Sequence, residues 1–264
     1  MKRYFIVGLM LCVSSLAVTQ PVVLQLHSNL KNNWDEESLN QGQSLQIITP
    51  PISPGVYSSP DPDSVVSFSI TQNQPSLKLV STDVVYCCGG SCSSNQSDLG
   101  GCTGGYNFTK STYITVGVGI ATVNLLDVTG QNVGSISVTV NPVPLWLDGY
   151  PHNNKSPFTV YRGQSLQIVG PATSASYPGF QPDGPIVSFS VTQSKNQPPL
   201  TLVKPIASVY CCGGSCNPTG GCAGGFMAQV ATYKADGVGS ATLSLLNENN
   251  KALGSIAIRV VDQK

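Results

Sequence analysis

Cysteine is the residue type in this chain best suited to chemistry, and eight of the nine cysteines fall into two similar clusters. The first cluster is Cys87-Cys88-Gly89-Gly90-Ser91-Cys92 with Cys102 following, and the second is Cys211-Cys212-Gly213-Gly214-Ser215-Cys216 with Cys222 following. A Val-Tyr pair precedes each cluster, and Gly-Gly-Cys-x-Gly-Gly closes it. Thiols this close together can form disulfides, bind a metal ion or exchange disulfides with another protein.

Structural disulfides are the interpretation that we favour for both clusters. An even number of cysteines in a secreted chain usually forms a disulfide framework. Adjacent cysteines should not pair with each other, because Cα atoms joined by a trans peptide lie about 3.8 Å apart, below the usual disulfide span. We therefore expect Cys87 and Cys88 to pair with Cys92 and Cys102 in one of two ways, and the second cluster to do the same.

A metal site and a redox site are the alternatives for the same sulfurs. Zinc accepts four thiolates, but its usual signature has two separated pairs with two residues between the cysteines of each pair. Three residues separate Cys88 from Cys92, so the Cys-x-x-Cys of disulfide exchangers is also absent. We expect no metal and no cofactor, and we keep a metal-binding or thiol-redox protein as the alternative function.

The clusters are part of a longer internal repeat. The string Gly-Gln-Ser-Leu-Gln-Ile at residues 42–47 returns at 163–168, and Gly-Val-Gly at 117–119 returns at 237–239. A period of roughly 120 residues matches a whole small domain rather than a solenoid repeat. We expect a signal peptide at 1–19 and two sandwich domains at 20–140 and 141–264, with Cys-rich loops at 86–105 and 210–225.

The first residues predict export from the cell. Lys2 and Arg3 precede a short apolar run that is typical of a signal peptide and too short to span a bilayer. We therefore expect a secreted protein, in the extracellular space, on the cell surface or in the periplasm, with no transmembrane segment. Only 10% of the residues are charged and no basic stripe is present, which argues against nucleic acid as a partner.

Apolar and polar residues alternate along many short segments, and this pattern predicts an all-β fold. In the stretch 65–71, Val66, Phe68 and Ile70 share one face, as in a strand with one buried side. We also expect an opening strand at 21–27, a loop at 29–40, and separate strands at 77–80 and 84–86. Gly130 and Asn250 should occupy the same left-handed turn position, and no amphipathic helix is predicted. Six to eight such strands per repeat predict two tandem antiparallel sandwiches.

The end of each repeat resembles the last two strands of bacterial immunoglobulin-like (Big-type) domains. Residues 119–140 contain a Gly-Ile-Ala-Thr-Val strand, an Asp-Val-Thr-Gly turn and a closing Val-Thr-Val strand, and residues 239–260 are similar. The resemblance covers about the last sixth of each domain and implies an immunoglobulin-like fold in an extracellular setting. The cysteine loops depart from that family's pattern, and the resemblance implies nothing about chemistry.

These observations predict a non-enzymatic binding, adhesion or structural protein. The two histidines, His27 and His152, do not occupy matching positions, and neither a His-Glu-x-x-His nor a Gly-x-Ser-x-Gly motif occurs. We expect no catalytic residues. The expected binding loops contain Gly89, Gly90 and Ser91 and their counterparts Gly213, Gly214 and Ser215, with the eight cysteines structural. The expected partner is a protein or a glycan of unknown identity.

Overall fold

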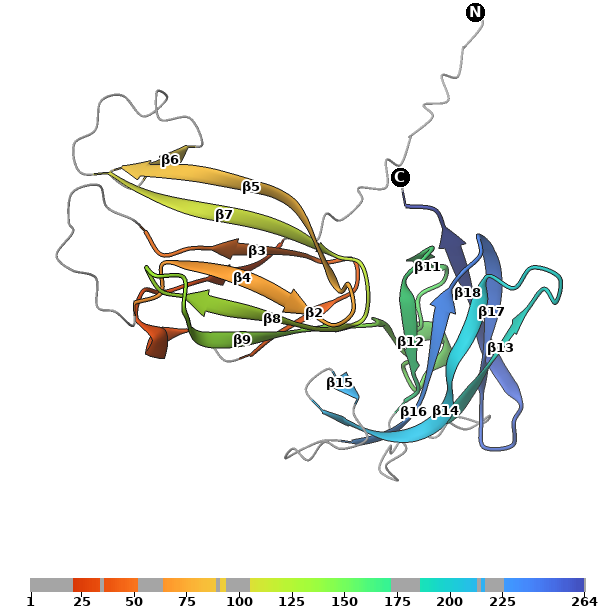
Figure 1. Cartoon of the computed structure of the whole chain (residues 1–264). Helices are drawn as coiled ribbons and strands as arrows, with labels where there is room; N and C mark the ends of the chain where they lie inside the picture. The colour runs from red at the N-terminus through yellow and green to blue at the C-terminus, as the bar shows by residue number, and fades with distance from the viewer. Residues whose placement is uncertain are drawn as a thin grey trace, which may run out of the picture.

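Two β-sandwiches follow one another along the chain (Figure 1). The computed structural model describes residues 21–33, 36–51, 64–88, 91–93, 105–171, 186–212, 215–216 and 226–263. Within these ranges the helices are two single 3-10 turns, η1 (Leu30–Asn32) and η3 (Pro151–Asn153), and no described helix is long and apolar enough to cross a membrane. The predicted all-β fold is confirmed. The predicted signal peptide lies outside the described residues.

Each sandwich consists of one five-stranded and one four-stranded sheet. The N-terminal sandwich has the orders β1-β3-β7-β5-β6 and β2-β9-β8-β4, and the C-terminal sandwich has β10-β12-β16-β14-β15 and β11-β18-β17-β13. The N-terminal strands are β1 Val22–Gln25, β2 Glu36–Asn40, β3 Ser44–Ile48, β4 Ser67–Gln72, β5 Leu77–Cys88, β6 Ser91–Ser93, β7 Tyr106–Thr115, β8 Gly119–Leu126 and β9 Asn132–Asn141. The C-terminal strands are β10 Val143–Trp146, β11 Phe158–Tyr161, β12 Ser165–Val169, β13 Ser188–Gln193, β14 Leu200–Cys212, β15 Ser215–Cys216, β16 Phe226–Ala235, β17 Gly239–Leu246 and β18 Ala252–Val261.

The strand connections are those of an immunoglobulin-like fold. One sheet pairs β3, β7 and β5 antiparallel, the other pairs β4, β8 and β9 antiparallel, and β2 joins β9 in parallel. The C-terminal sandwich repeats all of these pairings with β12, β16, β14, β13, β17, β18 and β11. In both sandwiches an added first strand, β1 or β10, runs parallel to its neighbour. The two tandem immunoglobulin-like sandwiches are therefore confirmed, while their residue boundaries stay a prediction.

Period-two alternation places the apolar residues between the two sheets of each sandwich. Leu45 and Ile47 of β3 and their counterparts Leu166 and Ile168 of β12 are fully buried in the two main cores. Among the described residues Phe189 is the largest fully buried side chain, whereas its counterpart Phe68 is only partly buried. The C-terminal core is therefore the more completely closed of the two at this position.

Two predicted elements were wrong, and both errors concern edge strands. The predicted loop at 29–40 contains β2, whose polar sequence Glu-Glu-Ser-Leu-Asn buries only Leu39. Its strand conformation comes from pairing with β9, a tertiary contact that alternation cannot reveal. The two predicted strands at 77–80 and 84–86 are one strand, β5, with a bulge at Val80. The expectation for Gly130 and Asn250 is confirmed, since both have positive φ, 80° and 58°.

Candidate functional site

The second cysteine cluster lies on a hairpin that projects beyond the C-terminal sandwich (Figure 1). β14 and β16 form its long strands, and β15 folds back against the end of β14. In this register Cys211 lies directly opposite Cys216, and a disulfide joins them. The pairing decides between the two predicted alternatives for this cluster: Cys211, the first cysteine of the adjacent pair, bonds to Cys216, which follows Gly-Gly-Ser in the sequence.

A second apolar cluster surrounds this disulfide. It consists of the buried residues Val169, Cys211, Ala228 and Val230, with Val209, Cys216 and Phe226 packed against them. Val169 follows Ile168 of the main core, so the two clusters lie on opposite faces of the same sheet. Trp146 contacts Phe226 edge to face at the margin, with ring centroids 6.4 Å apart. Cys211 is fully buried in this cluster, whereas Cys216 is partly buried at its margin.

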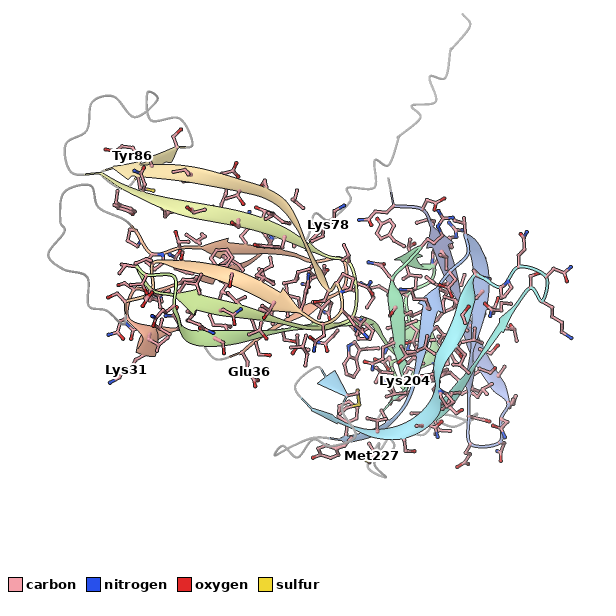
Figure 2. The ribbon with its side chains drawn as sticks, viewed as in Figure 1. Lys31, Glu36, Lys78, Tyr86, Lys204 and Met227 are labelled. Carbon is pink, nitrogen blue, oxygen red and sulfur yellow. A yellow bond between two sulfur atoms is a disulfide. The ribbon has the colours of Figure 1, made fainter. Side chains whose placement is uncertain are left out.

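The first cluster has the same arrangement. Cys87 at the end of β5 lies opposite Cys92 of β6, and Cys87 is disulfide-bonded and buried. Which cysteine bonds to Cys87 stays a prediction, with Cys92 and Cys102 as the two expected alternatives. Tyr86 marks this end of β5 in Figure 2, and Met227 marks the corresponding end of the C-terminal hairpin.

Four of the six predicted binding residues, and two of the cysteines predicted to be structural, lie outside the described residues. Gly89, Gly90, Cys102, Gly213, Gly214 and Cys222 lie outside the described residues, and Cys88, Ser91, Cys92, Cys212 and Ser215 are described only as parts of strands. Their binding role therefore stays a prediction. For Cys211 and Cys216 the joined sulfurs weigh against the metal-binding alternative, because a metal ligand must be a free thiolate.

A glutamine connects the two sandwiches. Gln41 follows β2 and is buried, and its side-chain oxygen accepts a hydrogen bond from the Ser165 backbone N–H at 2.7 Å. Its side-chain nitrogen donates to the carbonyls of Val116, at 2.9 Å, and Gly163, at 3.4 Å. Gln164 donates back to the Gln41 carbonyl at 3.3 Å. We call these contacts of Gln41 with Val116, Gly163, Gln164 and Ser165 the joint. Because both polar atoms of the buried Gln41 amide have hydrogen-bond partners there, these bonds fix how the sandwiches meet.

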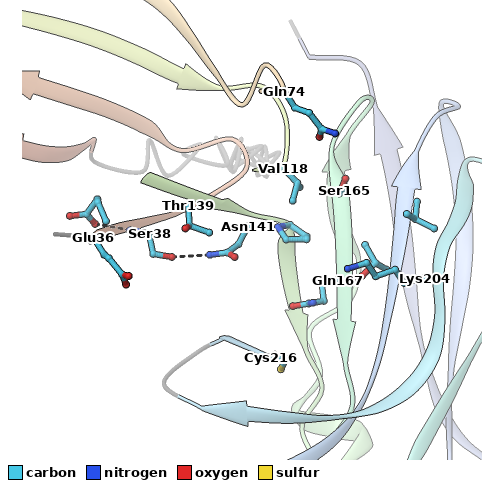
Figure 3. A pocket seen from close by; sticks show the side chains of 14 residues that line it. Glu36, Ser38, Gln74, Val118, Thr139, Asn141, Ser165, Gln167, Lys204 and Cys216 are labelled. Atoms are coloured by element: carbon cyan, nitrogen blue, oxygen red, sulfur yellow. Dashed lines mark hydrogen bonds between the residues drawn. The ribbon is translucent and has the colours of Figure 1, made fainter. Parts of the chain in front are cut away.

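A cleft of about 900 Å³ lies between the sandwiches beside this joint (Figure 3). The N-terminal sandwich contributes Glu36, Glu37 and Ser38 of β2 and Thr139 and Asn141 of β9. The C-terminal sandwich contributes Ser165 and Gln167 of β12, Thr232 of β16, Lys204 of β14 and Cys216 of β15. Hydroxyl and amide groups share both walls with the apolar side chains of Val118, Pro142 and Val203. Two carboxylates lie on one side and an ammonium on the other. Such groups can donate and accept hydrogen bonds to a polar ligand.

The cleft was not predicted from the sequence. Ser165 and Gln167 are the outward residues of the repeated Gly-Gln-Ser-Leu-Gln-Ile string, and nothing distinguishes them from their counterparts Ser44 and Gln46. Only the second copy lines the cleft, because the joint brings β2 and β9 against that copy. The angle between two domains depends on a few joint residues, which a strand pattern does not reveal.

The carboxyl group with a shifted pKa lies away from the cleft and the hairpins. Hydrogen bonds from the Thr129 hydroxyl, and then from nearby backbone N–H groups, hold the pKa of Asp127 below its ordinary value. Burial raises the pKa of Tyr113 and of its counterpart Tyr233. These residues belong to a turn and to the sandwich cores, so their shifts report structure rather than a reactive centre.

No protein-family model matches the chain, and no curated protein matches it. Among solved structures, amebosin is 16% identical with a TM-score of 0.24, covering 46% of this chain and 99% of that one. The titin Ig tandem domains A164-A165 are 10% identical with a TM-score of 0.21, and the match covers 86% of this chain and 94% of the titin chain. Domains 5-6 of the S-layer protein SbsC are 13% identical with a TM-score of 0.19, covering 88% and 95%. Likenesses with TM-scores of this size carry no argument about fold or function.

Proposed function

We propose that this chain is a non-enzymatic binding protein, secreted or displayed on the cell surface, that presents two disulfide-pinned hairpins on a rigid pair of sandwiches. The observation that carries the proposal is the Cys211–Cys216 disulfide in a hairpin that projects beyond its sandwich. The same register recurs at Cys87 in the first sandwich. Such a disulfide lowers the conformational entropy that the hairpin loses when it contacts a partner.

The cleft supports a binding role for the C-terminal hairpin in particular. Cys216 lines the cleft, so a ligand in the cleft also contacts the pinned end of this hairpin. The Gln41 hydrogen bonds hold the two walls in place before the ligand arrives. The mixed polar and apolar lining suits a protein segment or a glycan, both of which present donors and acceptors beside apolar surface.

A hairpin replacement tests this function. Residues 87–105 and 211–225 are replaced by short Gly-Ser turns, separately and together, and circular dichroism checks that both sandwiches remain folded. Wild-type protein is then compared with these variants on a printed glycan array and on an array of purified extracellular proteins. We expect selective binding by the wild type and loss of binding in the double replacement.

The matched control is Lys195→Ser/Asn196→Gly, which changes an exposed turn between β13 and β14. This variant should bind like the wild type. The proposal fails if the hairpin replacements bind as well as the wild type, or if the wild type binds nothing on either array. Unfolding of the single replacements would show instead that the hairpins serve stability alone.

A further inference from the structure

The outer edge of β5 has no partner strand along most of its length. β5 is followed in its sheet only by β6, which pairs with residues 86–88. In the described part of the chain, no strand pairs with the outer edge of Leu77–Val85. An unpaired strand edge presents free backbone N–H and C=O groups and readily accepts another strand.

Apolar side chains are exposed along this same edge. Leu79, Val80 and Val84 are 51%, 59% and 61% exposed. Proteins usually protect a long edge strand with prolines or several charges, because an apolar edge pairs with other chains. β5 contains no proline, and three of its apolar residues face solvent. This edge therefore has the composition of an interface rather than of a protected surface.

The two charges of β5 lie on the same face of the sheet and are symmetrically placed. Along the unbulged partner strand β7, Lys78 faces Ile114, Ser81 faces Thr112 and Asp83 faces Lys110. The bulge at Val80 adds one residue to β5, which brings Lys78 and Asp83 to the same face of the sheet. Counted along β7, Lys78 and Asp83 each lie two residues from the position of Ser81, on opposite sides of it. An antiparallel copy centred on Ser81 would therefore place each lysine opposite an aspartate.

We propose that a second copy of this chain pairs with β5, edge to edge and antiparallel, about a twofold axis at Ser81. Lys78 of each copy then faces Asp83 of the other, Leu79 faces Thr82, and Leu77 faces Val84. The second strand occupies residues 77–84, and β6 covers the edge only from residue 86 onwards, so the two do not compete. The two five-stranded sheets become continuous in the dimer.

The corresponding strand of the C-terminal sandwich, β14, also has an unpaired outer edge and exposed apolar residues, but it lacks the symmetric pair of opposite charges. β14 has Thr201 where β5 has Lys78, and it carries Lys204-Pro205 in its middle. It also has two register shifts against its neighbour, where β5 has one. Proline has no N–H to donate, and Lys204 has no self-complementary acid on this strand. The self-complementary pairing proposed for β5 therefore cannot be repeated on β14.

Sedimentation velocity of the full mature protein over a range of concentrations tests the proposal. We expect the wild type to dimerise reversibly. Lys78→Asp and Asp83→Lys should each weaken self-association at least about tenfold, because each variant places like charges opposite one another twice. An equimolar mixture of the two variants should dimerise again, since every opposing pair is then of opposite charge.

The matched control is Lys204→Asp, on the equivalent strand of the C-terminal sandwich, which should dimerise like the wild type. Circular dichroism confirms that each variant is folded. A wild type that stays monomeric at the highest concentration overturns the proposal. So does a dimer that persists unchanged in both charge-reversal variants, or a mixture that fails to restore association.

Discussion

The turn before β3 and its counterpart before β12 have the same backbone but different roles. Gly42 and Gly163 both have positive φ, 96° and 92°, and in each turn the next glutamine accepts a hydrogen bond from a backbone N–H three residues earlier. The residue before the glycine differs. Gln41 is buried and binds the C-terminal sandwich, whereas its counterpart Arg162 forms an exposed salt bridge with Asp262 at 3.0 Å.

This difference shows how a duplicated domain acquires a joint. The first copy places an amide, which can donate and accept at once, where the second copy has a cation that can only donate. The Gln41 amide therefore accepts from Ser165 and donates to Gly163 in one contact. The side chain before the turn glycine thus distinguishes the N-terminal sandwich, where Gln41 binds the other sandwich, from the C-terminal one, where Arg162 does not.

The largest expected difference between the sandwiches lies in their cores. Phe189→Ala should lower the free energy of unfolding of the C-terminal sandwich by about 3–5 kcal/mol, because Phe189 is fully buried. Phe68→Ala should cost the N-terminal sandwich less, because Phe68 is partly buried. Urea unfolding of each variant measures both. Equal losses in the two variants would show that the cores are not closed to different degrees.

Removing the Gln41 side chain from the joint should lower the free energy of unfolding by an intermediate amount. Gln41→Ala leaves buried groups of the joint without partners, which costs about 1–3 kcal/mol and should loosen the arrangement of the sandwiches. Small-angle X-ray scattering of Gln41→Ala should show a broader distance distribution than that of the wild type, and urea unfolding should show a lower free energy of unfolding. Arg162→Ala is the matched control and should change stability by less than about 1 kcal/mol. If the scattering and unfolding curves of Gln41→Ala were identical to those of the wild type, Gln41 would not hold the two sandwiches together.

The smallest expected effect concerns pH. Asp127 and its counterpart Asn247 each accept two backbone hydrogen bonds in their turns, but only Asp127 titrates. Its folded pKa is lowered from about 3.8, so its stabilisation is complete above that pH and is lost as the pH falls through the folded pKa.

Asp127→Asn should therefore reduce the acid dependence of unfolding in the N-terminal sandwich below about pH 4. Thermal unfolding at several pH values measures this dependence. The converse variant, Asn247→Asp, should introduce a weaker dependence into the C-terminal sandwich, since its turn offers the two backbone donors but has Asn249 in place of the Thr129 hydroxyl. Parallel pH profiles for wild type and Asp127→Asn would contradict the role of this carboxylate.

Alternation and turn chemistry predicted much of the fold. The strands with one apolar face, such as 65–71, and the left-handed turn at Gly130 and Asn250 follow directly from local sequence. β2 was missed because its polar residues become a strand only through pairing with β9. The cysteine clusters gave the disulfide pairing only as two alternatives, because the choice depends on a cross-strand register. The joint and the cleft depend on contacts between domains, for which the sequence holds no periodic signal.

Disulfide mapping of the unreduced protein tests the central claim most directly, namely that cross-strand disulfides pin both hairpins. Intact mass with and without alkylation counts free thiols, and electron-transfer fragmentation separates the adjacent cysteines. We predict no alkylation, with Cys211–Cys216 and Cys87–Cys92 bonds and with Cys212 and Cys88 bonded to Cys222 and Cys102. Alkylatable cysteines together with a metal released on denaturation would contradict the account and would identify the clusters as metal centres.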